Sequence, residues 1–177
     1  MRTVVVYTSQ TGFTKRYAQW IAQAAGADCL ELSAAKGRDL SGYEAIIFGG
    51  WARAGGICGL NWFKDNLGRW AGKKLIVFCV GGSPADSPEV GPALERNFSG
   101  EQRKQVSVFY CPGGFNYEKM PLASKLMMKL FIKMLKSRRG QTEAEREMVK
   151  MISSSYDISD KAYIQPILDC LEGGPTA

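Results

Sequence analysis

The sequence predicts an α/β fold: a doubly wound, five-stranded parallel sheet with strand order 2-1-3-4-5 and a helical insertion after strand 5. Apolar runs alternate with helical patterns, as expected when a parallel sheet is buried on both faces. Most of these runs end in glycine-containing turns, which would meet at the carboxyl edge of the sheet. We expect a single domain over residues 1–177, because this length supports a substantial core and no stretch resembles a linker.

Each expected element follows from a local pattern. Uninterrupted apolar runs predict strands over residues 3–7, 29–32, 44–50, 73–82 and 106–114. Helical spacing predicts helices over residues 13–25, 61–70 and 88–98, with a loop over residues 34–42. A capping box at Thr142 and Glu145 opens a helix towards Ile152, and Ser159-Asp160 caps a last helix to Leu171. We expect these two final helices to complete the layer that covers the sheet.

The first strand runs directly into a turn that is rich in hydroxyl groups, Thr8-Ser9-Gln10-Thr11-Gly12-Phe13-Thr14. Free backbone N–H groups, hydroxyls and the positive end of the next helix suit a phosphate there. The turn lacks the three glycines of G-x-G-x-x-G and the Gly-Lys-Ser/Thr of a Walker A loop. We therefore expect one dianionic monophosphate as the ligand; the alternative is an ordinary capped turn between strand and helix.

This turn resembles the T/S-x-T-G-x-T phosphate loop of the flavodoxins, which follows their first strand and binds the phosphate of FMN. The resemblance extends over essentially the whole chain. It implies a flavodoxin-like fold, FMN as the cofactor, and flavin contacts from the loops after strands 3, 4 and 5. The implied cofactor-binding residues are Thr8, Ser9, Gln10, Thr11, Gly12, Phe13, Thr14, Gly50, Trp51, Ala52, Arg53, Ala54, Gly55, Gly81, Gly82, Ser83 and Pro84, with Phe115 and Tyr117 as candidates to cover the outer ring face.

Arg53 is the candidate catalytic residue. Its fixed charge could stabilise an anionic reduced flavin or hold a substrate carboxylate, and the alternative is a solvated surface arginine. Trp51 could stack on the flavin ring or simply pack beside the strand. The chain has no histidine, which removes the usual general base and every Ser-His or Cys-His triad. Any chemistry would then depend on the cofactor, so an enzyme would be an FMN-dependent oxidoreductase; the sequence leaves open whether the protein is an enzyme.

The five cysteines are odd in number and form no C-x-x-C motif, which argues against a disulfide framework and a zinc site. With no histidine either, we expect no metal site. The apolar run at the amino end stops at Tyr7, which is too short for a signal peptide or a membrane span. We therefore expect a cytoplasmic location.

Positive charge is concentrated in one segment. The net charge is +6, and the stretch from Lys119 to Arg139 holds seven basic residues and no acidic ones, which leaves 16 basic and 17 acidic residues elsewhere. On a helix, four of these lysines form a stripe about 80° wide among leucines and methionines. The stripe consists of Lys125, Lys129, Lys133 and Lys136.

Such a helix, about 22 Å long, is too short and too charged to span a membrane. It could lie in a membrane interface, bind a partner groove or pack on its own domain with the lysines outward. We expect no nucleic-acid partner, because the cations lie on one apolar helix and form no broader basic surface.

The insertion after strand 5, over about residues 115–140, supports a narrower resemblance. Gly113-x-x-x-Tyr117 followed by a Lys/Met-rich helix resembles the flavodoxin-type, menaquinone-dependent protoporphyrinogen oxidases of bacteria. Gly-Gly-Trp-Ala-Arg-Ala-Gly at residues 49–55 is similar to their Gly-Ala-Ser-x-Arg-Tyr-Gly, although Ala54 stands at the position of their tyrosine. This resemblance implies an oxidase at the inner face of a membrane that passes electrons from a small hydrophobic substrate to a quinone.

Three hypotheses follow. The first is a cytoplasmic, FMN-binding, flavodoxin-like protein that transfers electrons to or from a redox partner. Electron-carrier flavodoxins are usually acidic and this chain is not, which favours the second hypothesis, the membrane-peripheral flavoenzyme. The third is a non-catalytic module that binds a partner protein and holds no flavin.

Overall fold

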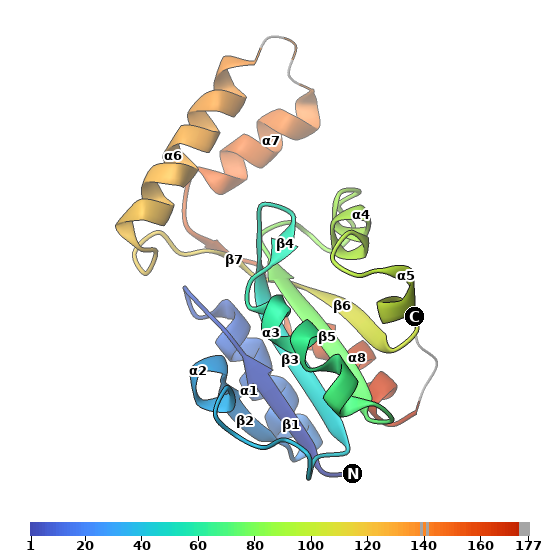
Figure 1. Ribbon diagram of the computed structural model, residues 1–177. Helices are drawn as coiled ribbons and strands as arrows, with labels where there is room; N and C mark the ends of the chain where they lie inside the picture. Colours follow the sequence, from blue (N-terminus) through green and yellow to red (C-terminus); the bar gives the residue numbers. More distant parts are fainter. Residues whose placement is uncertain (139, 141, 174–177) are drawn as a thin grey trace.

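The computed structural model describes residues 1–138, 140 and 142–173, so that Arg139 of the basic segment lies outside the described residues. The chain forms a sheet domain from which a two-helix arm projects (Figure 1). In chain order the elements are β1 (Thr3–Tyr7), α1 (Phe13–Ala25), β2 (Asp28–Glu31), α2 (Leu32–Ala35), β3 (Ala45–Arg53), β4 (Gly56–Ile57), α3 (Leu60–Asp65), η1 (Leu67–Trp70), β5 (Lys74–Gly81), α4 (Val90–Glu95), α5 (Gly100–Arg103), β6 (Val106–Pro112), β7 (Gly114–Phe115), α6 (Leu122–Ser137), α7 (Glu143–Ile152), β8 (Tyr156–Asp157), η2 (Lys161–Ile164) and α8 (Gln165–Leu171).

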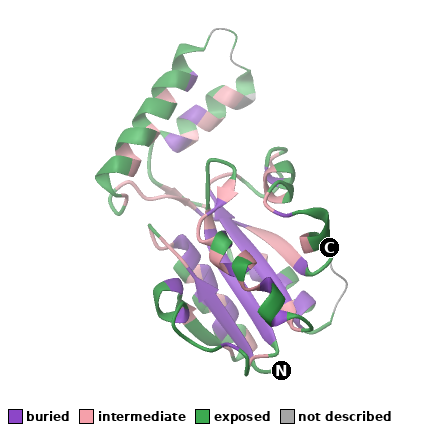
Figure 2. Ribbon diagram, viewed as in Figure 1, coloured by how far each residue is buried: buried purple, intermediate pink, exposed green. Residues whose placement is uncertain are grey.

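The main sheet confirms the predicted architecture. Its strands follow the order β2-β1-β3-β5-β6, and every neighbouring pair along this path is parallel. Alternate residues face opposite sides of a strand, so Val5 and Ile47 pack with α1 and α8, whereas Val6 and Phe48 pack towards α2 and α3. The buried residues therefore concentrate in the sheet (Figure 2). This is a doubly wound α/β domain.

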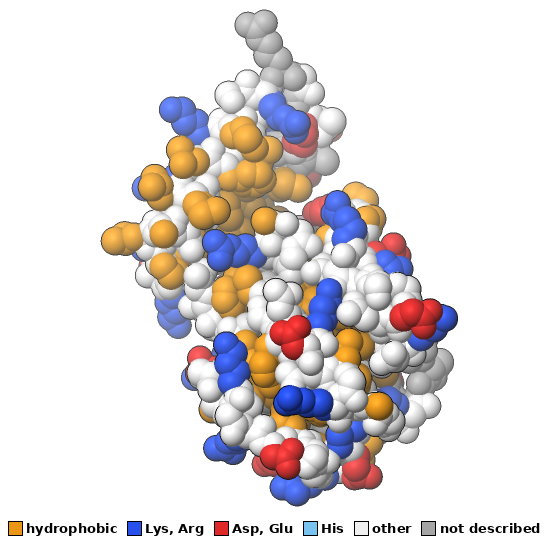
Figure 3. Space-filling model, in the orientation of Figure 1, with side chains coloured by type: hydrophobic (Ala, Val, Ile, Leu, Met, Phe, Trp, Pro, Cys, Tyr) orange, Lys and Arg blue, Asp and Glu red, His pale blue; other side chains and the backbone are white. Residues whose placement is uncertain are grey.

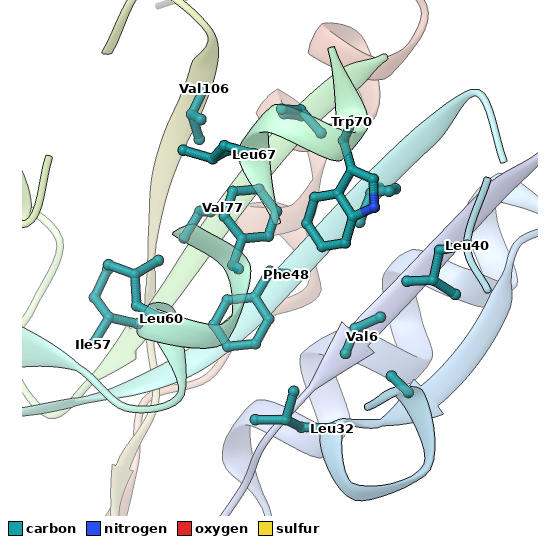
Figure 4. Packing of buried hydrophobic residues seen from close by; sticks show 14 of the residues in the cluster. Val6, Leu32, Leu40, Phe48, Ile57, Leu60, Leu67, Trp70, Val77 and Val106 are labelled. Atoms are coloured by element: carbon teal, nitrogen blue, oxygen red, sulfur yellow. The ribbon is translucent and has the colours of Figure 1, made fainter. Parts of the chain in front are cut away.

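The core on the α3 side is aromatic. Phe63, Leu67 and Trp70 of the helix expected over residues 61–70 are buried, although the segment divides into α3 and the 3₁₀ helix η1. The ring centroids of Phe63 and Trp70 are 5.3 Å apart, and those of Phe63 and Phe48 are 5.8 Å apart. Figure 4 shows Phe48 lying among Ile57, Leu60 and Trp70. Residues of β4, α3 and η1 thus meet around one residue of β3.

Several element boundaries differ from the prediction. Residues 32–35 form α2, which replaces the end of the strand expected over residues 29–32 and the start of the loop expected over residues 34–42. The helix expected over residues 88–98 is shortened to α4, and Ser99 caps the additional helix α5. The last helix divides into η2 and α8, because Pro166 lacks an N–H group and fits only the first turn of α8. The capping box of Thr142 and Glu145 is confirmed.

The glycine-rich segment after β3 is a hairpin and not an open loop. β3 continues to Arg53 and pairs antiparallel with β4. Ala54 and Gly55, at φ of 49° and 81°, make the turn with both central residues in the left-handed region. A Cβ atom on Gly50 would lie 2.3 Å from the Cys58 carbonyl oxygen, so only glycine allows this close approach. The hairpin extends the middle of the sheet beyond its carboxyl edge.

Replacing Ala54 by asparagine should stabilise the protein. Ala54 is the only non-glycine residue with positive φ in the described part of the chain, and asparagine tolerates this conformation better than alanine. We expect a gain of about 0.5–1 kcal/mol in the free energy of unfolding, measured by urea denaturation. Ala52→Asn, in the extended strand next to the turn, is the matched control and should show no gain.

The arm is built on a second, two-stranded sheet. β7 and β8 pair antiparallel, and the chain between them forms the hairpin of α6 and α7 (Figure 1). Leu135, Val149 and Ile152 are buried in a third cluster, separate from the two cores of the sheet domain. The helix α7 therefore packs on α6 and does not cover the sheet, in contrast to the expectation from the sequence. The inserted structure extends beyond residue 140 and includes α7.

A charged contact joins the base of the arm to α1. The Arg16 guanidinium lies 2.5 Å from a carboxylate oxygen of Asp157 and also donates to Ser159 Oγ. Partial burial raises the pKa of Asp157, but hydrogen bonds from Ser159 and Arg16 outweigh this effect and leave the pKa below its ordinary value. The carboxylate form is thus favoured in the folded protein.

This depressed pKa predicts a loss of stability in acid. The contribution of the Asp157 carboxylate to the free energy of unfolding is present above its pKa in the unfolded chain, about 3.9. This contribution disappears as the pH falls through the lower pKa of the folded protein. Because the two side chains are 43% and 45% exposed, we expect Asp157→Asn to lower the free energy of unfolding by at most about 1 kcal/mol at neutral pH. Denaturation at pH 7 and pH 3 checks this; an equal loss at both pH values would contradict it.

Candidate functional site

A cavity of about 520 Å³ lies at the carboxyl edge of the sheet, between the sheet domain and the arm. Its size is in the range of pockets that bind cofactors. The turn after β1, the ends of β3 and β5 with the residues that follow them, and β7 form its floor, and the arm forms its roof. The floor consists of Ser9, Gln10, Thr11, Phe13, Thr14, Trp51, Ala52, Arg53, Ala54, Val80, Gly81, Gly82, Ser83, Gly114 and Phe115.

The turn after β1 presents hydrogen-bond donors to this cavity. Gly12, at φ of 104°, begins α1 without a side-chain cap, and its N–H group donates to Ser9 Oγ. The N–H groups of Thr11, Phe13 and Thr14 have no acceptor among the described residues, as is usual at a helix start. The positive end of the helix dipole of α1, which has 13 residues, also favours a negative charge at this position. Free backbone donors at the positive end of a helix are an arrangement that suits an anion.

The β3–β4 hairpin forms another side of the cavity. Trp51 is half-buried and lines the cavity with its neighbours Ala52 and Arg53. Burial raises the pKa of the Cys58 thiol, and the nearby Arg53 guanidinium opposes this effect. Arg53 itself is exposed, so its charge is available to a ligand at the cavity wall.

Two tyrosines fix the loop after β5. Tyr156 Oη donates to the Gly82 carbonyl oxygen at 2.7 Å, and Tyr110 Oη donates to the Ser83 carbonyl oxygen at 2.8 Å. Burial raises the pKa of both phenols, so they remain neutral donors. A Cβ atom on Gly82 would lie 2.4 Å from the ring of Phe115, so glycine lets the ring reach the loop. The loop is thus held between β6 and the β7–β8 sheet.

The family of the chain is shown by a comparison with protein-family models. The model described as a flavodoxin domain matches residues 4–145, which include α6 and the strands of the main sheet except for Thr3, the first residue of β1. The chain belongs to the flavodoxin-domain family. No curated protein matches the sequence.

Solved structures resemble this flavodoxin domain at low sequence identity. A WrbA-like flavodoxin from Agrobacterium tumefaciens is 20% identical, with a TM-score of 0.42, over 69% of this chain and 86% of that chain. A flavodoxin from the domain Archaea is 17% identical, with a TM-score of 0.42, over 86% of this chain and 97% of the other. The reduced flavodoxin of Megasphaera elsdenii is 19% identical, with a TM-score of 0.42, over 68% and 89% of the two chains.

The roof of the cavity in this flavodoxin domain is rich in methionine. Five of the seven methionines line it, and all five come from the arm or the segment leading to it. Methionine is flexible and polarizable, so such a surface adapts to flat apolar groups. The sequence interpretation did not include the roof, which consists of Met120, Ser124, Met127, Met128, Phe131, Met148, Met151, Ile152 and Tyr156. The helical spacing of the apolar residues in α7 was the sequence pattern that could have indicated this helix as part of the roof.

The flavodoxin domain brings most of the predicted binding residues together. The predicted residues on the cavity wall come from the turn after β1, the β3–β4 hairpin, the loop after β5, and Phe115. Tyr117 points elsewhere, because its hydroxyl donates to the Ile152 carbonyl oxygen. The N–H group of Thr8 donates to the Gly49 carbonyl oxygen and ties β1 to β3. The predicted residues outside the lining are Thr8, Gly12, Gly50, Gly55, Pro84 and Tyr117.

Proposed function

We propose that this protein is a flavin-dependent oxidoreductase that binds FMN in the cavity at the carboxyl edge of its sheet. The observation that supports this proposal most directly is the turn after β1. Thr11, Phe13 and Thr14 of this turn line the cavity at the positive end of α1. Their N–H groups have no acceptor among the described residues, and the two threonines add hydroxyls. The chain also belongs to the flavodoxin-domain family.

The donor set fits a single phosphate. Ser9, Thr11 and Thr14 line the cavity and supply hydroxyls, and the helix start supplies backbone donors. Among the described residues no lysine lines the cavity, and Arg53 belongs to the β3–β4 hairpin and not to this turn. The turn itself would therefore hold the phosphate by hydrogen bonds and the helix field. This arrangement suits a terminal monophosphate such as that of FMN.

The remaining wall suits a flat aromatic ring. Trp51 and Phe115 offer ring surfaces, and the tyrosine-held carbonyls of Gly82 and Ser83 give the loop after β5 a fixed shape. The Arg53 charge would favour an anionic form of a group placed beside it. A bound flavin supplies the electron chemistry that side chains without histidine cannot. The protein positions the flavin, covers it with the arm and excludes water.

Titration of the apoprotein with FMN and with riboflavin tests the proposal. We expect FMN to bind and lose fluorescence, and riboflavin, which lacks the phosphate, to bind at least about a hundredfold more weakly. Equal affinities would mean that the turn does not hold the phosphate. No binding of either compound would overturn the proposal and favour a non-catalytic module.

The roof favours a second, narrower candidate. We infer an oxidase that passes electrons from a small hydrophobic substrate to a quinone, as the resemblance to the protoporphyrinogen oxidases implies. The support is the methionine-rich roof, which gives the space above the floor an apolar, adaptable lining. Mixing FMN-loaded protein with protoporphyrinogen and a menaquinone analogue should produce porphyrin fluorescence. If fluorescence rises no faster than in the protein-free mixture, this candidate fails while FMN binding stands.

A further inference from the structure

The outer face of α6 is an apolar surface with no partner in the described part of the chain. Leu122, Leu126, Leu130 and Met134 recur at every fourth position and are 54–84% exposed. Met127 and Phe131 continue this face and are 58% and 43% exposed. Figure 3 shows apolar side chains gathered over the arm. Scattered apolar residues are common on protein surfaces, but a continuous patch of this kind marks an interaction surface.

The lysines lie along one edge of this face. At 100° per residue, Lys125, Lys129, Lys133 and Lys136 occupy the sector next to the leucine row, and α6 contains no acidic residue. Lys136 also borders an open depression with Arg146 and Lys150 of α7, which carries the positive charge onto the second helix. The surface thus combines a wide apolar face with a cationic margin.

The opposite edge of the same face is the roof of the cavity. Met127 and Phe131 are exposed on the outer face and also line the cavity. The apolar face therefore runs along most of α6 from the lysine margin to the mouth of the cavity, and Ser137, at the last position of the helix, is the polar residue within it. A partner that covers this apolar face therefore also covers the mouth of the cavity.

We propose that α6 docks in the interface of an anionic phospholipid bilayer and that the cavity opens towards the bilayer at Met127 and Phe131. The apolar face suits the boundary between the headgroups and the acyl chains of the bilayer, and the lysine margin can pair with anionic headgroups. A second copy of this chain fits poorly, because pairing two identical faces would bring lysines near lysines. Delivery of an apolar ligand from the bilayer to the cavity rests on the proposed function, whereas docking of α6 does not.

Co-sedimentation of the flavin-free, full-length protein with vesicles tests the docking. We expect binding to vesicles of phosphatidylglycerol and phosphatidylcholine, and much weaker binding to phosphatidylcholine alone. Leu126→Gln/Leu130→Gln should weaken binding by about tenfold or more. Lys129→Gln/Lys133→Gln should weaken it by about fivefold for each lysine. Lys36→Gln/Lys161→Gln removes the same charge from exposed positions on the sheet domain and should change binding little.

Two outcomes would overturn the docking. One is vesicle binding that falls equally in the α6 variants and in the control with the same charge change. The other is no vesicle binding together with a concentration-dependent dimer that Leu126→Gln/Leu130→Gln abolishes, which would assign the face to a second copy. Because the FMN titration uses no vesicles and this assay uses no flavin, failure of docking and failure of the proposed function are distinguishable.

Quenching by brominated phosphatidylcholine in the anionic vesicles tests the position of the mouth. We expect emission from a Phe131→Trp variant to be quenched and shifted to shorter wavelength on binding. Lys161→Trp, at an exposed position in η2 of the sheet domain, is the control and should show no added quenching. If the bound Phe131→Trp variant is quenched no more than this control, the mouth faces away from the bilayer and the inference fails.

Discussion

Replacing Thr11 and Thr14 by alanine is expected to weaken FMN binding by about a hundredfold or more. Both residues line the cavity, and Thr14 is almost completely buried at the start of α1. A hydrogen bond to a charged phosphate contributes about 1.5–3 kcal/mol, so the loss of two hydroxyls removes about 3 kcal/mol or more. Fluorescence titration of the double variant with FMN measures the change in Kd directly.

The serine pair is the matched control for this prediction. Thr11→Ser/Thr14→Ser keeps both hydroxyls and removes only the methyl groups, so its affinity for FMN should stay close to that of the parent. Circular dichroism shows whether either variant has lost the fold. If the alanine and serine pairs lose affinity equally, the methyl groups and their packing matter, and the hydroxyls do not bind the phosphate.

Replacing Gly114 by alanine is expected to detach the arm from the sheet domain. Gly114 has φ of 149°, and a Cβ atom there would lie 2.1 Å from the backbone oxygen of Tyr156, which lies in the paired strand β8 next to Asp157, the cross-strand partner of Gly114. Backbone atoms cannot move aside as a flexible side chain can, so β7 and β8 must separate. We expect a local cost on the order of 2–4 kcal/mol.

Hydrogen exchange with detection by mass spectrometry distinguishes a local effect from global unfolding. Peptides from the arm and from β8 should exchange faster in Gly114→Ala, while those from β1, β3 and β5 should keep their protection. Gly37→Ala is the control, because its Cβ atom would meet nothing within 4 Å. Uniform loss of protection across the sheet would show that Gly114 supports the whole domain and not the arm alone.

Local patterns in the sequence predicted the sheet and the turn after β1. The runs around Val5, Ile47 and Val77 are apolar on both faces because both faces are covered, so their burial is visible without knowledge of their neighbours. The turn at residues 8–14 was predictable because its hydroxyls, its glycine and the following helix are contiguous. FMN binding itself stays a prediction.

The structural features that the sequence patterns did not predict depend mainly on contacts and conformations that have no local signal. The β3–β4 hairpin lacks an Asn-Gly or Asp-Gly signal, since Ala54 occupies the first left-handed position of its turn. The helix α7 is compatible with any apolar partner, and in the structure it packs on α6 within the segment between β7 and β8 and not on the main sheet. The carbonyl contact of Tyr156 with Gly82 joins residues far apart in the chain and has no local pattern.

The pairing of β7 with β8 has an evolutionary consequence. The chain leaves the sheet domain at Phe115 and returns at Tyr156, and these two residues are direct partners across antiparallel strands. A tight turn could bridge the same gap, so the arm is a module that can be gained, lost or exchanged without shifting the register of the main sheet. A chimera with a short hairpin loop in place of residues 116–155 should therefore fold as a minimal domain and keep the turn after β1 intact.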